Sequence, residues 1–168
     1  MAGAVAACKE QGYNVTATLL DIDGVRQAML RGDGAGIATL DVSNDKAYTA
    51  MTTRTDTGVL VERAKTTQPS QIILKEPHML LAQGAIVIKI GEEFVAALGV
   101  SGAPGGEKDE ACARAALEIE RTLAEDGARP IIFYAPAGNC RQPYVKGLTI
   151  MSNSIYNGWR MEDVWLDN

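Results

Sequence analysis

The sequence predicts an α+β fold, in which helices flank one antiparallel sheet of about five strands. Two pairs of apolar, β-branched segments are each joined by a short turn of glycine and acidic residues. Segments with helical periodicity lie before, between and after these pairs. Because hairpins make antiparallel pairs and helices must cover the apolar faces of the sheet, this order excludes a parallel sheet with crossover helices.

The first hairpin follows a short alanine-rich segment. Residues 3–11 predict a helix that ends at Gly12, a residue suited to the left-handed conformation of a helix end. Residues 14–22 and 25–31 are extended runs separated by Asp23-Gly24. Both of these turn residues tolerate positive φ, so they predict a tight hairpin.

The middle of the chain predicts two helices and a loop. Residues 43–54 place apolar side chains on one side of a helix, with Ser43 as the N-cap, and residues 58–65 predict a second, shorter helix. Residues 66–77 contain two prolines and predict a loop with a short strand at 72–74.

A second hairpin and a long helix complete this part of the chain. Residues 85–90 and 94–101 predict two strands joined by a turn at 91–93. After a glycine-rich turn at 102–106, residues 107–126 predict a helix with acidic side chains in its first turn. One face of that helix carries Cys112, Ala116, Ile119 and Leu123.

Composition limits the domain number and the partners. The chain has 168 residues, of which 46% are hydrophobic, so it can form a buried core without extra crosslinks. Six of its nine aromatic residues lie after residue 127, which divides the chain into a domain at 1–127 and a C-terminal extension at 128–168. A net charge of -5 and the lack of a long apolar run argue against nucleic-acid and membrane partners.

The cysteines and the start of the sequence predict a cytoplasmic protein. Cys8, Cys112 and Cys140 are widely spaced and form no zinc or redox motif, so we expect reduced thiols. The first ten residues lack the basic region of a secretory signal, which we therefore do not expect.

Three features permit both a structural and a chemical interpretation. Asp21-Ile22-Asp23-Gly24 after an apolar strand is typical of phosphotransferases of the haloacid-dehalogenase type, but the second strand that follows at once favours a hairpin turn. The glycine-rich turn at 102–106 precedes a helix, as phosphate-binding loops do, but it lacks the Lys-Ser or Lys-Thr signature. His78, the single histidine, is suited either to the surface or to ligation of iron.

Read together, the segments resemble the GlcG/HbpS-like family, also called the haem-degrading-domain family, which includes the C-terminal domain of PduO-type corrinoid proteins. The resemblance covers about residues 4–123. Two positions depart from the family pattern, because His78 replaces a glycine and Ala85 replaces the second glycine of a pair. The matching segments are Leu20-Asp21-Ile22-Asp23-Gly24, Arg31-Gly32-Asp33-Gly34-Ala35, Lys46-Ala47-Tyr48-Thr49-Ala50, Pro77-His78-Met79-Leu80-Leu81, Gln83-Gly84-Ala85, Gly99-Val100-Ser101-Gly102-Ala103 and Asp109-Glu110-Ala111-Cys112-Ala113.

The resemblance implies a PAS- or profilin-like sheet, assembly into a homo-oligomer, and binding of haem, or of a corrinoid in the PduO branch. On this basis we expect a small cytosolic protein that binds haem or another tetrapyrrole. Arg31 and Lys46 would pair with propionates, and His78 or Tyr48 would ligate iron. The candidate cofactor-binding residues are His78, Tyr48, Lys46, Arg31 and Asp33, with His78 as the metal ligand.

Two alternatives remain open at this point. Asp33 or Lys46 would serve in acid/base chemistry if the protein were an enzyme acting on a small organic acid or an aromatic catabolite in a cleft between subunits. The aromatic residues of the extension at 128–168 would instead favour a module whose main role is self-association.

Overall fold

The computed structural model of the protein describes residues 1–70, 73, 75–126, 145–146 and 165–166. Two compact units divide the chain at residue 128, the first spanning Met1–Ala128 and the second Arg129–Asn168. In the second unit, β5 (Val145–Lys146) pairs with β6 (Trp165–Leu166) in an antiparallel arrangement. No helix among the described residues is both long and apolar enough to cross a bilayer.

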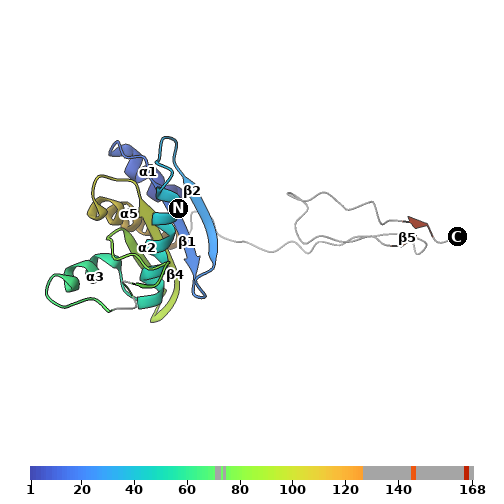
Figure 1. The fold of residues 1–168 in the computed structure, drawn as a ribbon. Helices are drawn as coiled ribbons and strands as arrows, with labels where there is room; N and C mark the ends of the chain where they lie inside the picture. Colours follow the sequence, from blue (N-terminus) through green and yellow to red (C-terminus); the bar gives the residue numbers. More distant parts are fainter. Residues whose placement is uncertain (71–72, 74, 127–144, 147–164, 167–168) are drawn as a thin grey trace. The chain divides into compact units, whose positions relative to one another are not determined.

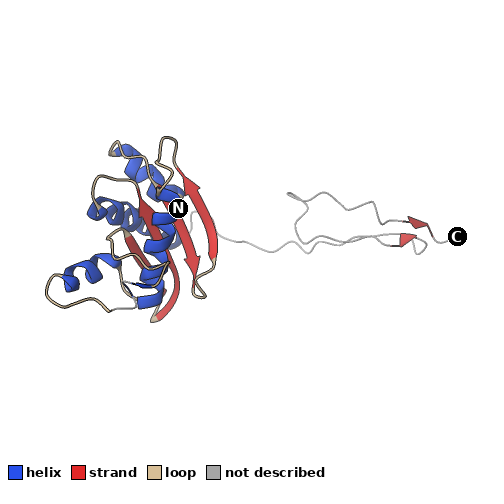
Figure 2. Cartoon of the chain, viewed as in Figure 1, coloured by secondary structure: helices blue, strands red, loops and turns tan. Residues whose placement is uncertain are grey.

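The first unit is built around a four-stranded sheet with the strand order β2-β1-β4-β3 (Figures 1 and 2). Every neighbouring pair is antiparallel, which confirms the predicted α+β fold with two hairpins. The sheet has one strand fewer than expected: residue 73 is helical, and residues 72 and 74 lie outside the described residues. The strands are β1 (Thr16–Asp21), β2 (Arg26–Arg31), β3 (Ala85–Ile90) and β4 (Glu93–Ser101).

The helices agree with the sequence prediction except at the start of α2. That helix begins four residues before Ser43, which is therefore not an N-cap. Ser43 is buried in the helix, and its hydroxyl lies 2.7 Å from the hydroxyl of Thr18 in the sheet. The helices are α1 (Ala2–Glu10), α2 (Thr39–Thr53), α3 (Thr57–Ala64) and α5 (Gly106–Glu125).

One face of the sheet packs against α1 and α5. Successive strand residues point to opposite faces, so Ala17 and Val100 belong to this side. The buried cluster on this face consists of Ala4, Cys8, Val15, Ala17, Ile86, Leu98, Val100, Cys112, Ala113 and Ala116. Helix α5 is buried along its first half only, because Ile119 and Leu123 are 47% and 43% exposed, although the sequence pattern placed them on the same apolar face.

The opposite face packs against α2 at short range. A Cβ atom on Gly99 of β4 would lie 2.1 Å from the Ser43 carbonyl oxygen and 2.9 Å from the Ala47 amide nitrogen. The backbone of α2 therefore approaches this strand at a distance that only glycine permits. The buried cluster on this side consists of Leu20, Ala47, Ala50, Met51, Ala85 and Ala97.

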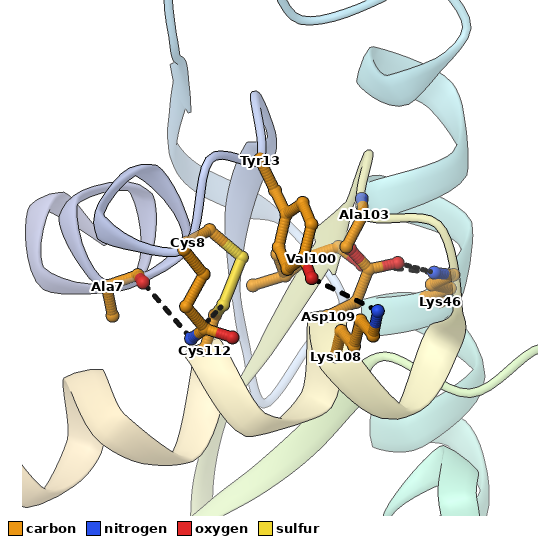
Figure 3. The surroundings of a disulfide bond; sticks show 10 residues. Ala7, Cys8, Tyr13, Lys46, Val100, Ala103, Lys108, Asp109 and Cys112 are labelled. Atoms are coloured by element: carbon orange, nitrogen blue, oxygen red, sulfur yellow. Dashed lines mark hydrogen bonds and ion pairs between the residues drawn. A yellow bond between two sulfur atoms is a disulfide. The ribbon is translucent and has the colours of Figure 1, made fainter.

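Cys8 and Cys112 form a disulfide that joins α1 to α5 (Figure 3). The expectation that these two thiols are reduced is therefore wrong. The pairing was invisible in the sequence because the two cysteines are 104 positions apart and belong to no recognisable motif. Both residues are fully buried, so the disulfide lies inside the core between the two helices. The third cysteine, Cys140, lies outside the described residues.

Candidate functional site

Lys46, one of the predicted ligand-binding residues, lies in a buried ion pair. Its Nζ is 2.8 Å from Oδ2 of Asp109 on α5, and it also donates to the Val100 carbonyl oxygen at 3.1 Å (Figure 3). The two side chains are only 5% and 4% exposed. Lys46 therefore joins α2 to β4 and α5. Its positive charge is balanced by the Asp109 carboxylate.

The glycine-rich turn at 102–106 is closed by the same carboxylate. The backbone N–H of Ala103 donates to Oδ1 of Asp109 at 2.9 Å, so this turn holds an internal anion where a phosphate loop would hold a ligand. Burial raises the pKa of the Asp109 carboxyl, while the hydrogen bonds from Lys46 and from the Ala103 amide oppose that shift. The turn at 102–106 therefore has a structural role, and its contact with Asp109 gives no indication of a phosphate-binding loop.

Gly84 leaves the space that this ion pair requires. Its φ is +136°, a value that L side chains rarely adopt, and an added Cβ would lie 2.6 Å from the Lys46 Nζ. The same Cβ would lie 2.8 Å from the Val100 carbonyl oxygen. The glycine before β3 therefore allows the lysine to cross to α5.

Asp21, the residue that resembles a phosphotransferase nucleophile, instead stabilises the first hairpin turn. Its Oδ1 accepts hydrogen bonds from the backbone N–H groups of Asp23 and Val25, at 3.0 and 2.9 Å. Its Oδ2 accepts a hydrogen bond from the side-chain amide of Gln27. Within the described part of the chain, no group of three His, Cys, Asp or Glu side chains could hold a metal ion.

His78, Tyr48 and Asp45 come together at the surface of α2, and we call them the His78 cluster. The Nδ1 of His78 lies 3.8 Å from Oδ1 of Asp45. The rings of Tyr48 and His78 meet edge to face, with centroids 6.1 Å apart and planes inclined at 68°. The side chain of His78 is 67% exposed, so one edge of its ring is available to a ligand.

The local sequence explains why these three residues meet. Asp45 and Tyr48 are three positions apart on α2, and this spacing places them on the same side of the helix. The segment that carries His78 is tied to the same helix, because the backbone N–H of Leu80 donates to the Thr49 hydroxyl at 2.7 Å. The sequence could not reveal Asp45 as a partner of His78, since 33 positions separate them.

A hollow of about 220 Å³ lies beside Tyr48. Arg54 lines this hollow, and it is a cation that the sequence did not single out as a candidate ligand-binding residue. Arg54 is the C-cap of α2 and has a left-handed backbone with φ of 50°, and its guanidinium lies 5.6 Å from the centre of the Phe94 ring. The hollow is lined by Ile22, Asp23, Gly24, Tyr48, Met51, Thr52 and Arg54.

Arg31 and Asp33 lie at the opposite end of the first hairpin. Arg31 pairs with Thr16 at the start of β1. Gly24, in the turn after β1, lies beside Tyr48: a Cβ atom added to Gly24 would be 3.3 Å from the Tyr48 ring. A six-residue strand spans about 17 Å, so the two ends are well separated. Arg31 and Asp33 instead line a cleft between α1 and β2. Within one chain, the five predicted residues therefore occupy three places.

The chain is similar to a known protein family and to several solved structures. The family model described as haem degrading protein HbpS-like matches residues 1–118. A crystal structure of a double mutant of Streptomyces reticuli HbpS is 32% identical, with a TM-score of 0.65 over 70% of this chain and 79% of that chain. None of the curated proteins compared with the chain matches it.

Two solved structures of lower identity share the fold. The PduOC:Heme complex is 19% identical, with a TM-score of 0.64 over 70% of this chain and 86% of that chain. The Klebsiella pneumoniae protein ORFY is 22% identical, with a TM-score of 0.65 over 73% of this chain and 85% of that chain. The family match extends from α1 into α5 and includes the whole four-stranded sheet. The chain therefore belongs to the HbpS-like family of haem-degrading proteins.

Proposed function

We propose that this protein binds haem or a related iron tetrapyrrole, with His78 as the iron ligand. The observation that carries the proposal is the position of Asp45 beside Nδ1 of the exposed His78 ring. Membership of the HbpS-like family and the fold shared with the PduOC:Heme complex support it.

The contacts of His78 fit the requirements of an iron ligand. A histidine that binds a metal through one ring nitrogen usually directs its other N–H toward a carboxylate or a carbonyl. Asp45 lies on the Nδ1 side at 3.8 Å, so its charge favours a proton there and leaves the lone pair on Nε2. Imidazole and phenolate are both known haem ligands, and the adjacent Tyr48 is therefore a second candidate ligand.

Cations near the His78 cluster would bind the propionates. Arg54 lines the hollow beside Tyr48, and guanidinium groups bind carboxylates in a bidentate manner. Lys46 is unsuited to this role because it is buried and paired with Asp109. Arg54 therefore replaces Lys46 as the proposed partner of a propionate. Arg31 and Asp33 remain candidate ligand-binding residues, but in the separate cleft between α1 and β2.

Three further expectations belong to this proposal. Homo-oligomerisation and binding of a corrinoid are predictions from the family resemblance, which light scattering and a cobalamin titration will test. The cytoplasmic location is a prediction from the wide spacing of the cysteines, which form no recognisable motif. The Cys8–Cys112 disulfide points in the other direction, because disulfides persist mainly in oxidising compartments.

A haemin titration of the purified apo-protein tests the proposal. We expect a shifted Soret band that saturates at one haem per chain and loses its shift in His78→Ala. Asp45→Asn should keep the band but weaken haem affinity about tenfold, as expected for a group that orients a ligand. Glu76→Ala, an exposed change two positions from His78, is the matched control and should bind like the unmodified protein. An unshifted Soret band, or one unchanged by His78→Ala and Tyr48→Ala, would reject the assigned ligands.

A further inference from the structure

The two edges of the four-stranded sheet differ in how their outward backbone groups are bonded. β2 and β3 are the edge strands, because the strand order is β2-β1-β4-β3 (Figure 1). At the β3 edge, the backbone N–H of Val87 donates to Oδ1 of Asp56 at 2.8 Å. The backbone N–H of Ala85 donates to the Thr57 hydroxyl, also at 2.8 Å. Side chains at the start of α3 therefore close this edge.

The β2 edge has no such cover. Gly32, just after β2, donates its backbone N–H to the Val15 carbonyl oxygen at 2.9 Å, which fixes the hydrogen-bonding pattern between β1 and β2. Hydrogen-bonded and non-hydrogen-bonded pairs alternate in an antiparallel ladder, so Leu30 bonds to β1 while Met29 and Arg31 direct their backbone N–H and C=O groups away from it. Within the part of the chain that the structure describes, no hydrogen bond reaches these outward groups.

The side of β2 that faces α1 offers an apolar surface. Leu30 pairs with Ala17, a member of the buried cluster between the sheet and the helices α1 and α5, so its side chain lies on this side. Leu30 is 39% exposed and, with Val5 of α1, lines the cleft between α1 and β2, which has a volume of about 460 Å³. Lys9 and Asp33 line the same cleft with opposite charges. The cleft therefore has no net charge and is suited to apolar side chains.

The side of β2 that faces α2 is positively charged. Arg31 pairs with Thr16, whose hydroxyl lies 2.7 Å from the Thr39 hydroxyl of α2. Arg26 pairs with Leu20, which belongs to the buried cluster on the same side of the sheet. Paired residues of neighbouring strands share a face, so both guanidinium groups lie on the α2 side.

Neither arginine of β2 is paired with an acid. Arg31 donates to the Ala35 carbonyl oxygen, which is a neutral acceptor. Among the described residues, no carboxylate lies within 4.0 Å of the guanidinium of Arg26 or Arg31. Antiparallel pairing of β2 with the β2 strand of a second copy would bring the arginines of both copies to one face, where like charges repel. The charges of this edge therefore favour an acidic partner.

We propose that β2 accepts an extended segment of another protein as an additional antiparallel strand, and that this segment alternates acidic and apolar side chains. The backbone of the segment bonds to the outward N–H and C=O groups of Met29 and Arg31. Successive strand residues point to opposite faces, so the acidic side chains lie beside Arg26 and Arg31 while the apolar ones lie against Leu30 and the cleft. Backbone bonds provide affinity for any extended segment, and the alternation selects the partner.

Titration of the full-length protein with a fluorescent peptide of alternating glutamate and valine, followed by anisotropy, tests the proposal. We expect saturable binding that protects the backbone N–H groups of Met29 and Arg31 from hydrogen exchange. In an antiparallel pair the glutamates direct their N–H groups toward β2, because they share a face with Arg31. N-methylated glutamates should therefore abolish binding, and N-methylated valines, the matched control, should not. No saturable binding, or a loss caused by the methylated valines instead, would overturn the proposed pairing.

Two variants of Met29 isolate the backbone bond. Met29→Pro removes the outward N–H, while Met29→Ala shortens the side chain and keeps it. Proline is accommodated on edge strands where its nitrogen faces away from the ladder, so we expect circular dichroism to show the fold intact in both variants. Met29→Pro should bind the Glu–Val peptide about tenfold more weakly than Met29→Ala. Equal affinity in the two variants would reject strand addition at β2.

Charge reversal tests the α2 side of the edge. Arg31→Glu should weaken binding of the Glu–Val peptide about three- to tenfold and strengthen binding of a peptide that alternates lysine and valine. Arg26→Glu should act in the same direction, and it breaks no hydrogen bond to Ala35 if Arg31→Glu fails to fold. Arg63→Glu, an exposed change on α3, is the matched control and should leave both affinities unchanged. Equal effects of the three reversals would show attraction to net charge alone.

The apolar side and the alternative occupant have their own readouts. A peptide that alternates glutamate and serine should bind more weakly, because serine cannot cover the apolar surface of Leu30 and Val5. Equal affinity for the serine and valine peptides would reject the cleft as the anchor. If the Glu–Val peptide failed to bind and Met29→Pro lowered the mass measured by light scattering, a second copy would occupy the edge and the proposal would be wrong.

Discussion

The Nζ of Lys46 lies 2.8 Å from Oδ2 of Asp109, although the two residues are 63 positions apart in the sequence. Lys46 comes from α2 on one face of the sheet and Asp109 from α5 on the other, so the pair joins the two helical layers. The second carboxylate oxygen holds the turn that leads into α5 through the Ala103 amide. One buried contact therefore connects three parts of the fold.

Lys46→Met should destabilise the protein by about 3–5 kcal/mol, because it leaves the Asp109 carboxylate buried without its counter-charge. Unfolding in urea, followed by circular dichroism at neutral pH, measures this loss. Lys65→Met is the matched control. Lys65 pairs with Glu62 at the surface, so its substitution should lower the free energy of unfolding by about 1 kcal/mol at most. The double change Lys46→Met and Asp109→Leu should recover most of the stability, and a loss as large as that of the single variant would contradict the explanation.

Acid should favour the folded state at Asp109. Burial raises the pKa of this carboxyl above its usual value of 3.8, so the folded chain takes up the proton at a pH where the unfolded chain is still ionised. The stability that this proton provides is present at low pH and is lost as the pH rises through the raised pKa. Asn at this position cannot titrate, so the free energy of unfolding of the unmodified protein minus that of Asp109→Asn should increase as the pH falls from neutral toward 4. If this difference in free energy of unfolding decreased as the pH falls, the pKa of Asp109 would be lowered in the folded protein and the prediction would be wrong.

Gly99→Ala should destabilise the protein by about 3 kcal/mol, since its Cβ would lie 2.1 Å from the Ser43 carbonyl oxygen and would force α2 away from the sheet. Thermal unfolding measured by calorimetry reports the change. Gly36→Ala is the control, because the only atom near its added Cβ is Thr39 Cγ2 at 3.9 Å. Equal melting temperatures for the two variants would argue against the close approach of α2.

Loss of the Cys8–Cys112 bond should lower the free energy of unfolding by about 2–5 kcal/mol. The bond joins two residues 104 positions apart, and it therefore closes a long loop and restricts the unfolded chain. Urea unfolding of the Cys8→Ser and Cys112→Ser double variant measures the effect, with Cys140→Ser as a control that keeps the bond. Alkylation under denaturing, non-reducing conditions, followed by peptide mapping, should leave Cys8 and Cys112 unlabelled. Labelling of both cysteines before reduction would show that the bond is absent from the protein.

Local chemistry made the hairpins and most helices predictable. Asp23-Gly24 supplies turn residues with the required backbone freedom, and the structure shows Gly24 with a φ of 75°. The start of α2 was misplaced because Ser43 has the chemistry of a helix cap, but its hydroxyl binds Thr18 in the sheet. A tertiary contact thus replaced the local role that the residue type favours.

The candidate site was less predictable than the fold. The family resemblance assigned Lys46, His78, Tyr48, Arg31 and Asp33 to cofactor binding, and of these five only His78 and Tyr48 are seen in contact. Lys46 is enclosed by Asp109, and Asp45 and Arg54 are new members of the proposed haem site. These assignments depend on which side chains lie close in space, and periodicity does not report this.

The sequence alone determined the types and order of the elements, since turn residues, helix ends and apolar periodicity act over a few neighbouring positions. The tertiary structure decided which distant groups meet: Cys8 with Cys112, Lys46 with Asp109, and His78 with Asp45. The physical reason is distance along the chain, because a charge or a thiol acquires its partner only when packing of the helices on the sheet brings the two within bonding range.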